Sequence, residues 1–484
     1  MSTKFSVKNI ALYTLIAFLY SMLIVFLGVA LLTNKIDSIV SSYGVMIPMI
    51  FAVLFALMML FIYQSYIIKH KFINGSQLRE VLIIFTMVTL IVAFTCTLSI
   101  KNPYVVPMSA AALLVSILIG QRIAVMTSVS TFFILMILCP TTTYFITKDS
   151  TLLNGSLSQI LGLMVGLISS VSMCFLVHRG YTRLKITLGA LIIAVIVSLL
   201  GIPLGFIEKN YTYQSITLTV GYIFIGNAIA IGTTTILLPI FERLFRIWTD
   251  FRLAEICSMN QPLLKELREK APGTFSHSMT VSILAEASAL AIGLNPFMAK
   301  ACAMYHDIGK IKNPQFFTEN QEGGYNPHDD LIIDVSVKMI TEHPEEGAEI
   351  LKQHHMPDTI VKVAHEHHGN STLMFFYLKA KGLTEGDLET DEYRYNDPKP
   401  STKYSAIIMI CDMAEATIRA VKPQTKDDME NIVYNIIQGR ITDGQFTNCD
   451  ISLLELSKIK DTICEVMPAL LHQRIDYKKA EENR

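Results

Sequence analysis

Histidine and aspartate side chains that could bind metal ions recur through the C-terminal half of the chain. Ten of the twelve histidines follow residue 250. The candidate ligands stand in the order His277, His306-Asp307, His343, His367-His368 and Asp412. Imidazole and carboxylate groups are ligands for Mn, Fe, Zn or Ni. An adjacent His-Asp pair suits a two-metal site, because the imidazole binds one ion while the two carboxylate oxygens reach both.

Charge balance predicts what such a site would do. Two divalent ions, the carboxylates of Asp307 and Asp412 and one hydroxide leave a net charge of about +1, which suits a singly charged phosphodiester. Metal ions lower the pKa of bound water toward neutrality, so no separate protein base is required. We therefore expect hydrolysis of a phosphoester, with His306 and Asp307 as catalytic residues. Lys310, one turn beyond Asp307, either contacts the phosphate or pairs with a carboxylate.

The segments that carry these residues have the periodicity of helices. Apolar residues recur at helical spacing over about 275–293, 297–308, 331–341, 344–355, 357–367, 401–421, 425–439 and 450–472. Strand-like alternation is scarce, and turn-forming residues separate the segments. We predict one all-α domain over residues 271–475, followed by a charged tail over 476–484. The polar stretch 381–400 is expected to form a loop or flap.

The N-terminal half is apolar enough to lie in a membrane. Residues 1–240 hold only 13 basic and 4 acidic side chains. Apolar runs long enough to span a bilayer occur at about 10–32, 45–68, 81–100, 103–119, 122–140, 158–178, 186–206 and 217–240. We predict a membrane domain of about eight helices over residues 1–240 and an amphipathic linker helix over 241–270. The adjacent runs 103–119 and 122–140 could instead form a hairpin that does not fully cross.

The charge distribution orients the chain and excludes some functions. With eight spans, nine Lys or Arg residues fall on the side of the N-terminus and four on the other side, so the positive-inside rule predicts that the N-terminus and the C-terminal half are cytoplasmic. Residues 241–484 carry a net charge of −10, which argues against binding a nucleic acid polymer. The uneven composition excludes a single globular domain and a mostly disordered chain.

The ordered metal-ligand residues resemble those of the HD-domain phosphohydrolases, and more closely those of the seven-transmembrane HD proteins, whose characterised members degrade cyclic di-AMP. The similarity extends to the short motifs Ala271-Pro272-Gly273-Thr274, Glu319-Asn320-Gln321, Asn326-Pro327-His328-Asp329 and Pro398-Lys399-Pro400 with Thr402-Lys403. Two features differ from that family. Only residues 33–44 separate the first two apolar runs, where the family usually carries a large extracytoplasmic domain, and Ser276 replaces a second histidine.

The resemblance implies how the ligands divide between two Mn²⁺ or Fe²⁺ ions. One ion would take His277, His306, Asp307 and Asp412. The other would take Asp307, His343, His367 and His368. On the substrate side, a guanidinium or phenol can hold a second phosphate or stack on a base; the candidates there are Arg394, Tyr395, Lys403, Ser401 and His328. A solvated loop is the alternative interpretation of these residues.

The function that this resemblance implies is hydrolysis of cyclic di-AMP to 5′-pApA, on the cytoplasmic face of a bacterial cell membrane. The expected partners are the cyclic dinucleotide and the lipid bilayer, and a homodimer is left open. One alternative is hydrolysis of a guanosine polyphosphate, a mononucleotide or cyclic di-GMP, although Gly324-Tyr325-Asn326 lacks the Gly-Tyr-Pro signature of cyclic di-GMP hydrolases. Another is a nucleotide-binding membrane receptor without turnover. A transporter rests only on the last apolar run, where Gly226 and Asn227 predict close helix packing with an interhelical amide bond or, alternatively, a buried ligand site.

Overall fold

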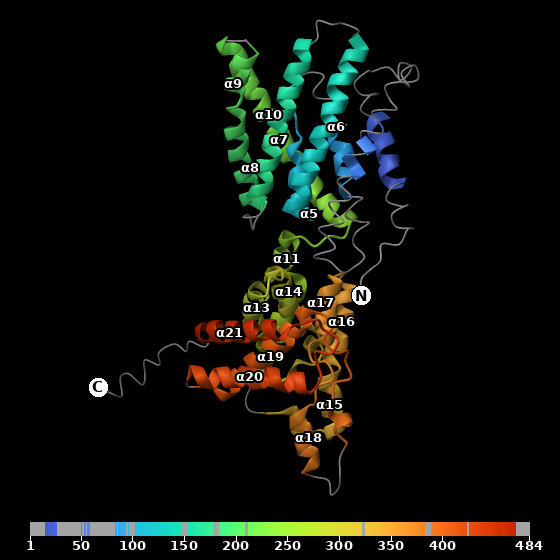
Figure 1. Ribbon diagram of the computed structural model, residues 1–484. Helices are drawn as coiled ribbons and strands as arrows, with labels where there is room; N and C mark the ends of the chain where they lie inside the picture. The colour runs from blue at the N-terminus through green and yellow to red at the C-terminus, as the bar shows by residue number, and fades with distance from the viewer. Residues whose placement is uncertain are drawn as a thin grey trace, which may run out of the picture. The chain divides into compact units, whose positions relative to one another are not determined.

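The computed structural model describes residues 15–26, 102–147, 153–177, 183–208, 212–321, 325–382, 389–423 and 425–470, with scattered residues of 50–58 and 83–95. Contacts divide the chain into two units, Met1–Thr249 and Asp250–Arg484, which are described separately (Figure 1). Every regular element in these described residues is a helix, and their one extended pairing is an isolated bridge between Thr372 and Arg394. The predicted all-α fold class is confirmed.

Long apolar helices make up the first unit. Its described helices include α5 Ser109–Leu118, α6 Gln121–Thr147, α7 Leu153–Val177, α8 Arg183–Ser198, α9 Gly201–Ile207 and α10 Tyr213–Leu244. Within the described residues, three segments are long and apolar enough to cross a membrane: Leu157–Leu176, Arg183–Ile207 and Tyr213–Leu244. Apolar side chains such as Ile192 and Ile236 are exposed on these helices. The structure describes only parts of the predicted runs 10–32, 45–68 and 81–100: Leu15–Phe26 is a shorter apolar helix, and scattered residues of the other two runs are described.

The apolar run 103–119 is not one spanning helix. Residues 102–108 are irregular chain, and only Ser109–Leu118 form helix α5. Ten helical residues extend about 15 Å, which is half of the ~30 Å hydrocarbon core of a bilayer. Gly120 then takes a φ of +144°, and α6 begins at Gln121. Hydropathy does not distinguish a helix from buried irregular chain, so the predicted spanning helix is wrong over residues 103–108.

The irregular segment 102–108 is buried because a glycine on a neighbouring helix makes room for it. A side chain added at Gly162 on α7 would overlap the carbonyl oxygen of Pro103. Just beyond the segment, the Ser109 hydroxyl donates a 3.1 Å hydrogen bond to Oδ1 of Asn227 on α10. The last apolar run therefore makes the interhelical hydrogen bond through a side-chain amide that its sequence predicts.

The second unit is a helical domain. Its helices are α11 Asp250–Ile256, α12 Pro262–Lys270, α13 Pro272–Ala291, α14 Pro296–Tyr305, α15 Ile333–Thr341, α16 His343–Gln353, α17 Asp358–Glu366, α18 Met374–Lys381, α19 Lys403–Val421, α20 Lys426–Thr442 and α21 Leu453–Leu470. Helix α13 packs against α14, α19 and α21. Helices α19, α20 and α21 lie side by side (Figure 1). The charged tail 476–484 and part of the predicted flap lie outside the described residues.

The predicted linker helix over 241–270 is divided into three helical pieces. Helix α10 ends at Leu244, and α11 and α12 follow as separate helices. At the end of α10, Arg246 takes a left-handed φ of +50°, and the Ile247 amide donates to the carbonyl of Glu242 at 2.9 Å. A left-handed residue with this backward hydrogen bond is a helix-terminating Schellman motif. The single linker helix was a wrong prediction, because this motif stops the helix.

The contact of Gly162 with Pro103 predicts a large cost for a small substitution. Gly162→Ala should lower the stability of the full-length protein by about 1–3 kcal/mol, because the methyl group has no space. Gly221→Ala on α10 is the matched control, since a Cβ there meets nothing within 4 Å. Thermal unfolding in detergent measures both. Equal midpoints for the two variants would contradict the close packing of segment 102–108.

Candidate metal centre

Three buried histidines lie at helix ends, and their backbone surroundings orient their rings. His306 follows the last residue of α14, His343 is the first residue of α16, and His367 follows the last residue of α17. In each, Nδ1 lies 2.7–2.8 Å from the carbonyl oxygen three residues earlier, at Ala303, Ile340 and Ala364. A carbonyl oxygen only accepts, so Nδ1 carries the proton and donates. Nε2 is therefore left without a proton and available to bind a metal ion.

The carboxylate of Asp307 lies between two groups of these ring nitrogens. Its Oδ2 is 3.3 Å from Nε2 of His306, whereas its Oδ1 is 3.2 Å from Nε2 of His343 and 3.5 Å from Nε2 of His367. Two sets of groups close enough to hold an ion follow from this arrangement: His277 with His306 and Asp307, and Asp307 with His343, His367 and His368. The two sets share only Asp307.

The buried atoms of this cluster fit two cations. Nε2 of His306 and Oδ1 of Asp307 are buried and have no hydrogen-bond partner in the described residues, whereas Oδ2 of Asp307 forms a 2.7 Å ion pair with Lys310. Burying polar atoms without partners is costly. Divalent cations would remove that cost, because unprotonated imidazole nitrogens and carboxylate oxygens are suitable ligands for them.

Asp412 and a second acid complete one side of the cluster. His277 Nε2 is 2.8 Å from Oδ1 of Asp412, and His277 Nδ1 is 2.6 Å from Oε2 of Glu415. The guanidinium of Arg419 also donates to Glu415. Glu415 therefore orients His277 through the ring nitrogen that faces away from Asp412. Sequence analysis missed Glu415, although its position three residues after Asp412 puts both acids on one face of α19.

Two groups of the cluster have pKa values that suit metal binding, and His277 does not. Burial alone would raise the pKa of Asp307, but His306 and Lys310 hold it well below its usual value. Burial lowers the pKa of His367 to about 4. Burial alone would lower the pKa of His277, but hydrogen bonds to Asp412 and Glu415 raise it to about 10. Metal binding at His277 must therefore displace a proton.

Lys310 pairs with carboxylates at the edge of the cluster. Its Nζ is 2.7 Å from Oδ2 of Asp307 and 3.0 Å from Oε1 of Glu319. The ammonium also lies 4.8 Å from the centre of the Phe317 ring. Of the two roles predicted for Lys310, the structure shows the pairing with carboxylates.

Two family models match the chain. The family model described as a 7TM receptor with intracellular HD hydrolase matches residues 43–249, and the HD domain model matches residues 274–417. The chain belongs to this seven-transmembrane HD family. The apolar helices and the family match indicate a membrane protein.

Two curated relatives carry the name cyclic-di-AMP phosphodiesterase PgpH. The protein of Listeria monocytogenes is 37% identical over 390 residues, covering 80% of this chain and 52% of the relative. The protein of Bacillus subtilis is 34% identical over 382 residues, covering 78% and 52%. The chain thus spans about half the length of these relatives. A crystal structure of the L. monocytogenes PgpH HD domain in complex with cyclic-di-AMP is 45% identical, with a TM-score of 0.43, and covers 44% of this chain and 99% of that chain.

The predicted substrate residues lie in different surroundings. Tyr395 stacks on the ring of His368 with centroids 4.3 Å apart, so it adjoins the cluster. Arg394, the preceding residue, donates to the carbonyl of Asn370 at 3.1 Å and lies 3.5 Å from Asp443. Of these two residues, the structure brings Tyr395 to the metal centre and anchors Arg394 on Asn370 and Asp443.

The other three candidates contact groups that are not metal ligands. Lys403 Nζ is 2.6 Å from Oε1 of Glu455 on α21. His328 is buried against the rings of Phe316 and Phe376, and its Nε2 donates to the Phe316 carbonyl at 2.9 Å. The Ser401 amide and hydroxyl both donate to Glu366. The described contacts therefore do not bring these three residues to the metal centre.

A buried carboxylate lies in the same loop. Asp397 Oδ1 is 3.5 Å from Nε2 of His365, and its Oδ2 is buried without a hydrogen-bond partner in the described residues. Burial, with a smaller contribution from Glu345, raises the pKa of Asp397 to about 7. The ionised form is therefore disfavoured in the folded chain.

Glu415→Gln should weaken metal binding by about 10- to 100-fold, because a partner that orients a ligating histidine sets its basicity and direction. Titration with Mn²⁺, followed by the signal of the free ion, measures the affinity. Glu430→Gln is the matched control, since Glu430 is half-exposed and, within the described residues, lies 3.6 Å from Lys426 on the same helix. An unchanged affinity in Glu415→Gln would contradict the role of Glu415 as a positioning residue.

The raised pKa of Asp397 predicts how stability depends on pH. As pH rises from about 4 to about 7, the unfolded chain ionises this group before the folded chain does, so the folded state loses stability. Asp397→Asn should therefore stabilise the protein at pH 8, by up to about 4 kcal/mol, and less at pH 5. Thermal unfolding at both pH values measures the effect. An equal gain at both pH values for Asp397→Asn would contradict the assignment.

Proposed function

We propose that the chain is a membrane-anchored phosphodiesterase that hydrolyses cyclic di-AMP to 5′-pApA. The observation that carries the proposal is the position of Asp307, whose two oxygens face two different groups of histidines. A carboxylate in this position can bridge two metal ions, which is the arrangement that phosphoester hydrolysis uses. The names of the Listeria and Bacillus relatives support cyclic di-AMP as the substrate.

The donor set supports a site for two Mn²⁺ or Fe²⁺ ions. One would be held by His277, His306, Asp307 and Asp412. The other would be held by Asp307, His343, His367 and His368. Such ions activate water at neutral pH and neutralise the charge that develops on the phosphate. Mixed imidazole and carboxylate ligands are suited to these metals.

The residues of the chain perform the remaining tasks. Asp307 and Asp412 stay ionised at neutral pH, because cationic and imidazole neighbours hold each pKa well below its usual value despite burial. Lys310 holds Asp307 in place and presents a positive charge at the edge of the site. Tyr395 stacks on His368, is buried, and is proposed as an aromatic contact for an adenine. Arg394 is proposed as a second contact on this side.

Lys403, Ser401 and His328 stay predictions as substrate contacts. Their hydrogen bonds to Glu455, Glu366 and the Phe316 carbonyl favour a positioning role instead. Ser401 and Ser405 both donate to Glu366, which directly precedes His367. This network supports a loop anchored beside the metal ligands.

The proposed setting is the cytoplasmic face of a bacterial cell membrane. The excess of basic residues flanking the apolar runs on one side supports a cytoplasmic N-terminus and a cytoplasmic HD domain. The domain boundaries proposed from the sequence are a membrane domain over 1–240, a connecting segment over 241–270 and the HD domain over 271–475. A homodimer stays a prediction.

The test uses the purified full-length protein, loaded anaerobically with Mn²⁺ or Fe²⁺. Cyclic di-AMP, cyclic di-GMP and guanosine tetraphosphate are offered in parallel, and products are separated by chromatography. Cyclic di-AMP should be converted to 5′-pApA, and Asp307→Asn should lose at least about 100-fold in rate, because one bridging oxygen is lost. The exposed Asp461→Asn is the control and should retain full activity.

Two outcomes would overturn the proposal. Binding of cyclic di-AMP without turnover by the metal-loaded protein would favour a nucleotide-binding receptor. Turnover of another nucleotide in preference to cyclic di-AMP would keep the metal chemistry and replace the substrate.

A further inference from the structure

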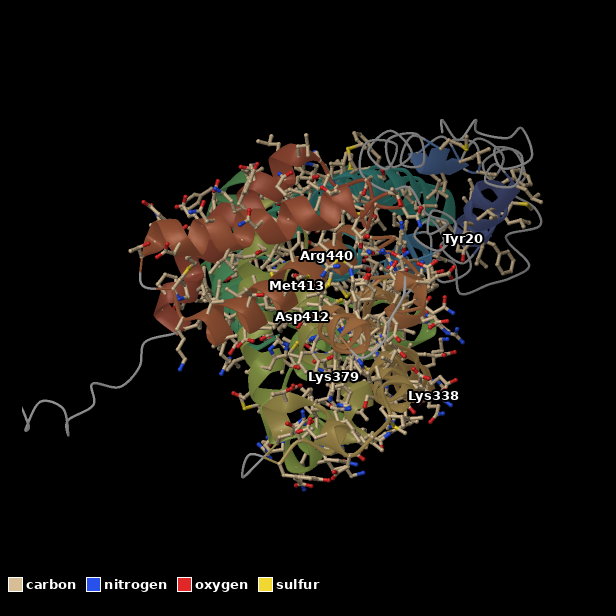
Figure 2. The ribbon with its side chains drawn as sticks, turned by 90° about the horizontal axis from the view of Figure 1, so that it is seen from below. Tyr20, Lys338, Lys379, Asp412, Met413 and Arg440 are labelled. Carbon is tan, nitrogen blue, oxygen red and sulfur yellow. The ribbon has the colours of Figure 1, made fainter. Side chains whose placement is uncertain are left out.

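Arg440, which the sequence analysis did not single out, lies beside the metal centre. It is in the last turn of α20, and its Nε donates to the thioether sulfur of Met413 on α19 at 2.8 Å. Met413 directly follows Asp412. Figure 2 shows Asp412, Met413 and Arg440 close together in the view from below. The guanidinium thus contacts the residue next to the proposed ligand Asp412, from a helix that contributes no ligand.

The guanidinium of Arg440 is positioned by a hydrogen bond to Met413, but no carboxylate in the described residues pairs with it. A thioether sulfur is a weak acceptor, and a guanidinium has five N–H donors. Its two terminal nitrogens make no hydrogen bond or ion pair within the described residues. The nearby carboxylate of Asp443 is already used, since it lies 3.5 Å from Arg394 and accepts a 2.6 Å hydrogen bond from Gln445.

Any basic residue is favourable at a helix C-terminus, but this preference does not explain why the Arg440 side chain is partly buried. An arginine that only stabilised the helix end would extend into solvent. Arg440 is instead half-buried against α19, and burial lowers its pKa although Asp443, Asp412 and Tyr395 act in the opposite direction. A partly desolvated guanidinium without an anionic partner needs a ligand that supplies one.

We propose that Arg440 binds the phosphodiester of the cyclic dinucleotide that is not being cleaved, and so selects substrates with two phosphates. This inference rests on the proposed function. A cyclic dinucleotide carries two phosphodiester groups, each with one negative charge. The metal centre accounts for one of them. Arg440 supplies a planar, two-pronged donor for the other, which is the geometry that guanidinium groups use to bind phosphate.

The contrast with Lys310 strengthens the assignment. Both residues carry a positive charge next to the metal centre, but Lys310 is paired with Asp307 and Glu319. Two carboxylates already balance that ammonium, whereas no carboxylate is bound to the Arg440 guanidinium in the described residues. Arg440 is therefore the cation with an unused anion-binding capacity.

The test compares a substrate with two phosphodiester groups and one with a single group. Cyclic di-AMP and bis(p-nitrophenyl) phosphate are given to the full-length, Mn²⁺-loaded protein and to Arg440→Gln. Arg440→Gln should raise the KM for cyclic di-AMP by about 10- to 100-fold, the usual effect of losing a hydrogen bond to a charged group, with kcat changed less than about 3-fold. Hydrolysis of bis(p-nitrophenyl) phosphate and the bound metal content should not change. Arg440→Lys should recover part of the affinity, because it restores the charge but not the two-pronged geometry.

The control is Arg268→Gln, which removes an exposed arginine of α12. Unchanged kinetics of Arg440→Gln with cyclic di-AMP would overturn the inference while leaving the proposed function intact. A parallel loss with both substrates, together with a loss of metal, would assign Arg440 a structural role and also overturn it. Wild-type turnover of bis(p-nitrophenyl) phosphate without turnover of cyclic di-AMP would instead overturn the proposed function, and this inference with it.

Discussion

Burial of the Asp307 carboxylate is the constraint on which the rest of the second unit depends. An ionised carboxylate is expensive to remove from water unless positive charge or hydrogen-bond donors surround it. Here the surrounding groups are mainly imidazoles, and those of His306, His343 and His367 use Nδ1 to donate to backbone carbonyls. Within the described residues, Lys310 places an ammonium 2.7 Å from Oδ2, and His306 also lowers the pKa of the carboxyl. Bound cations would therefore stabilise this cluster. Its geometry is that of a metal-binding site and not of a purely structural core.

Helix ends provide the precision that such a cluster needs. A helix leaves its last carbonyl groups without intrahelical partners, and two of these groups, at Ala303 and Ala364, accept from the histidine that ends each helix. The same interaction terminates the helix, fixes the tautomer and directs Nε2 inward. Close packing of Gly309 against α16 completes the arrangement, since a Cβ at Gly309 would overlap the carbonyl of His343. The turn that carries Asp307 can thereby approach His343 closely.

The sequence predicted what depends on residue type and order, and missed what depends on packing between distant segments. The candidate ligands from His277 to Asp412 could be selected because few other functions need that series of side chains. Glu415 and Arg440 could not be selected in the same way, because their importance comes from contacts across 138 residues with His277 and across 27 residues with Met413. Hydropathy likewise found the apolar run 103–119 but not its irregular first half, since burial by a glycine on α7 is a tertiary property.

The two basic residues beside the metal centre show why local charge counting is insufficient. Counting would give Lys310 and Arg440 equal weight, yet Lys310 is balanced by Asp307 and Glu319, whereas Arg440 donates to a sulfur atom. A balanced cation contributes to the integrity of the site, because removing it leaves buried carboxylates uncompensated. A partly buried cation without a carboxylate partner favours ligand binding. The free-energy cost of removing it from water is already included in folding, and its charge is available to an anionic ligand. Lys310 and Arg440 differ in their hydrogen-bond acceptors, which are determined by the folded structure.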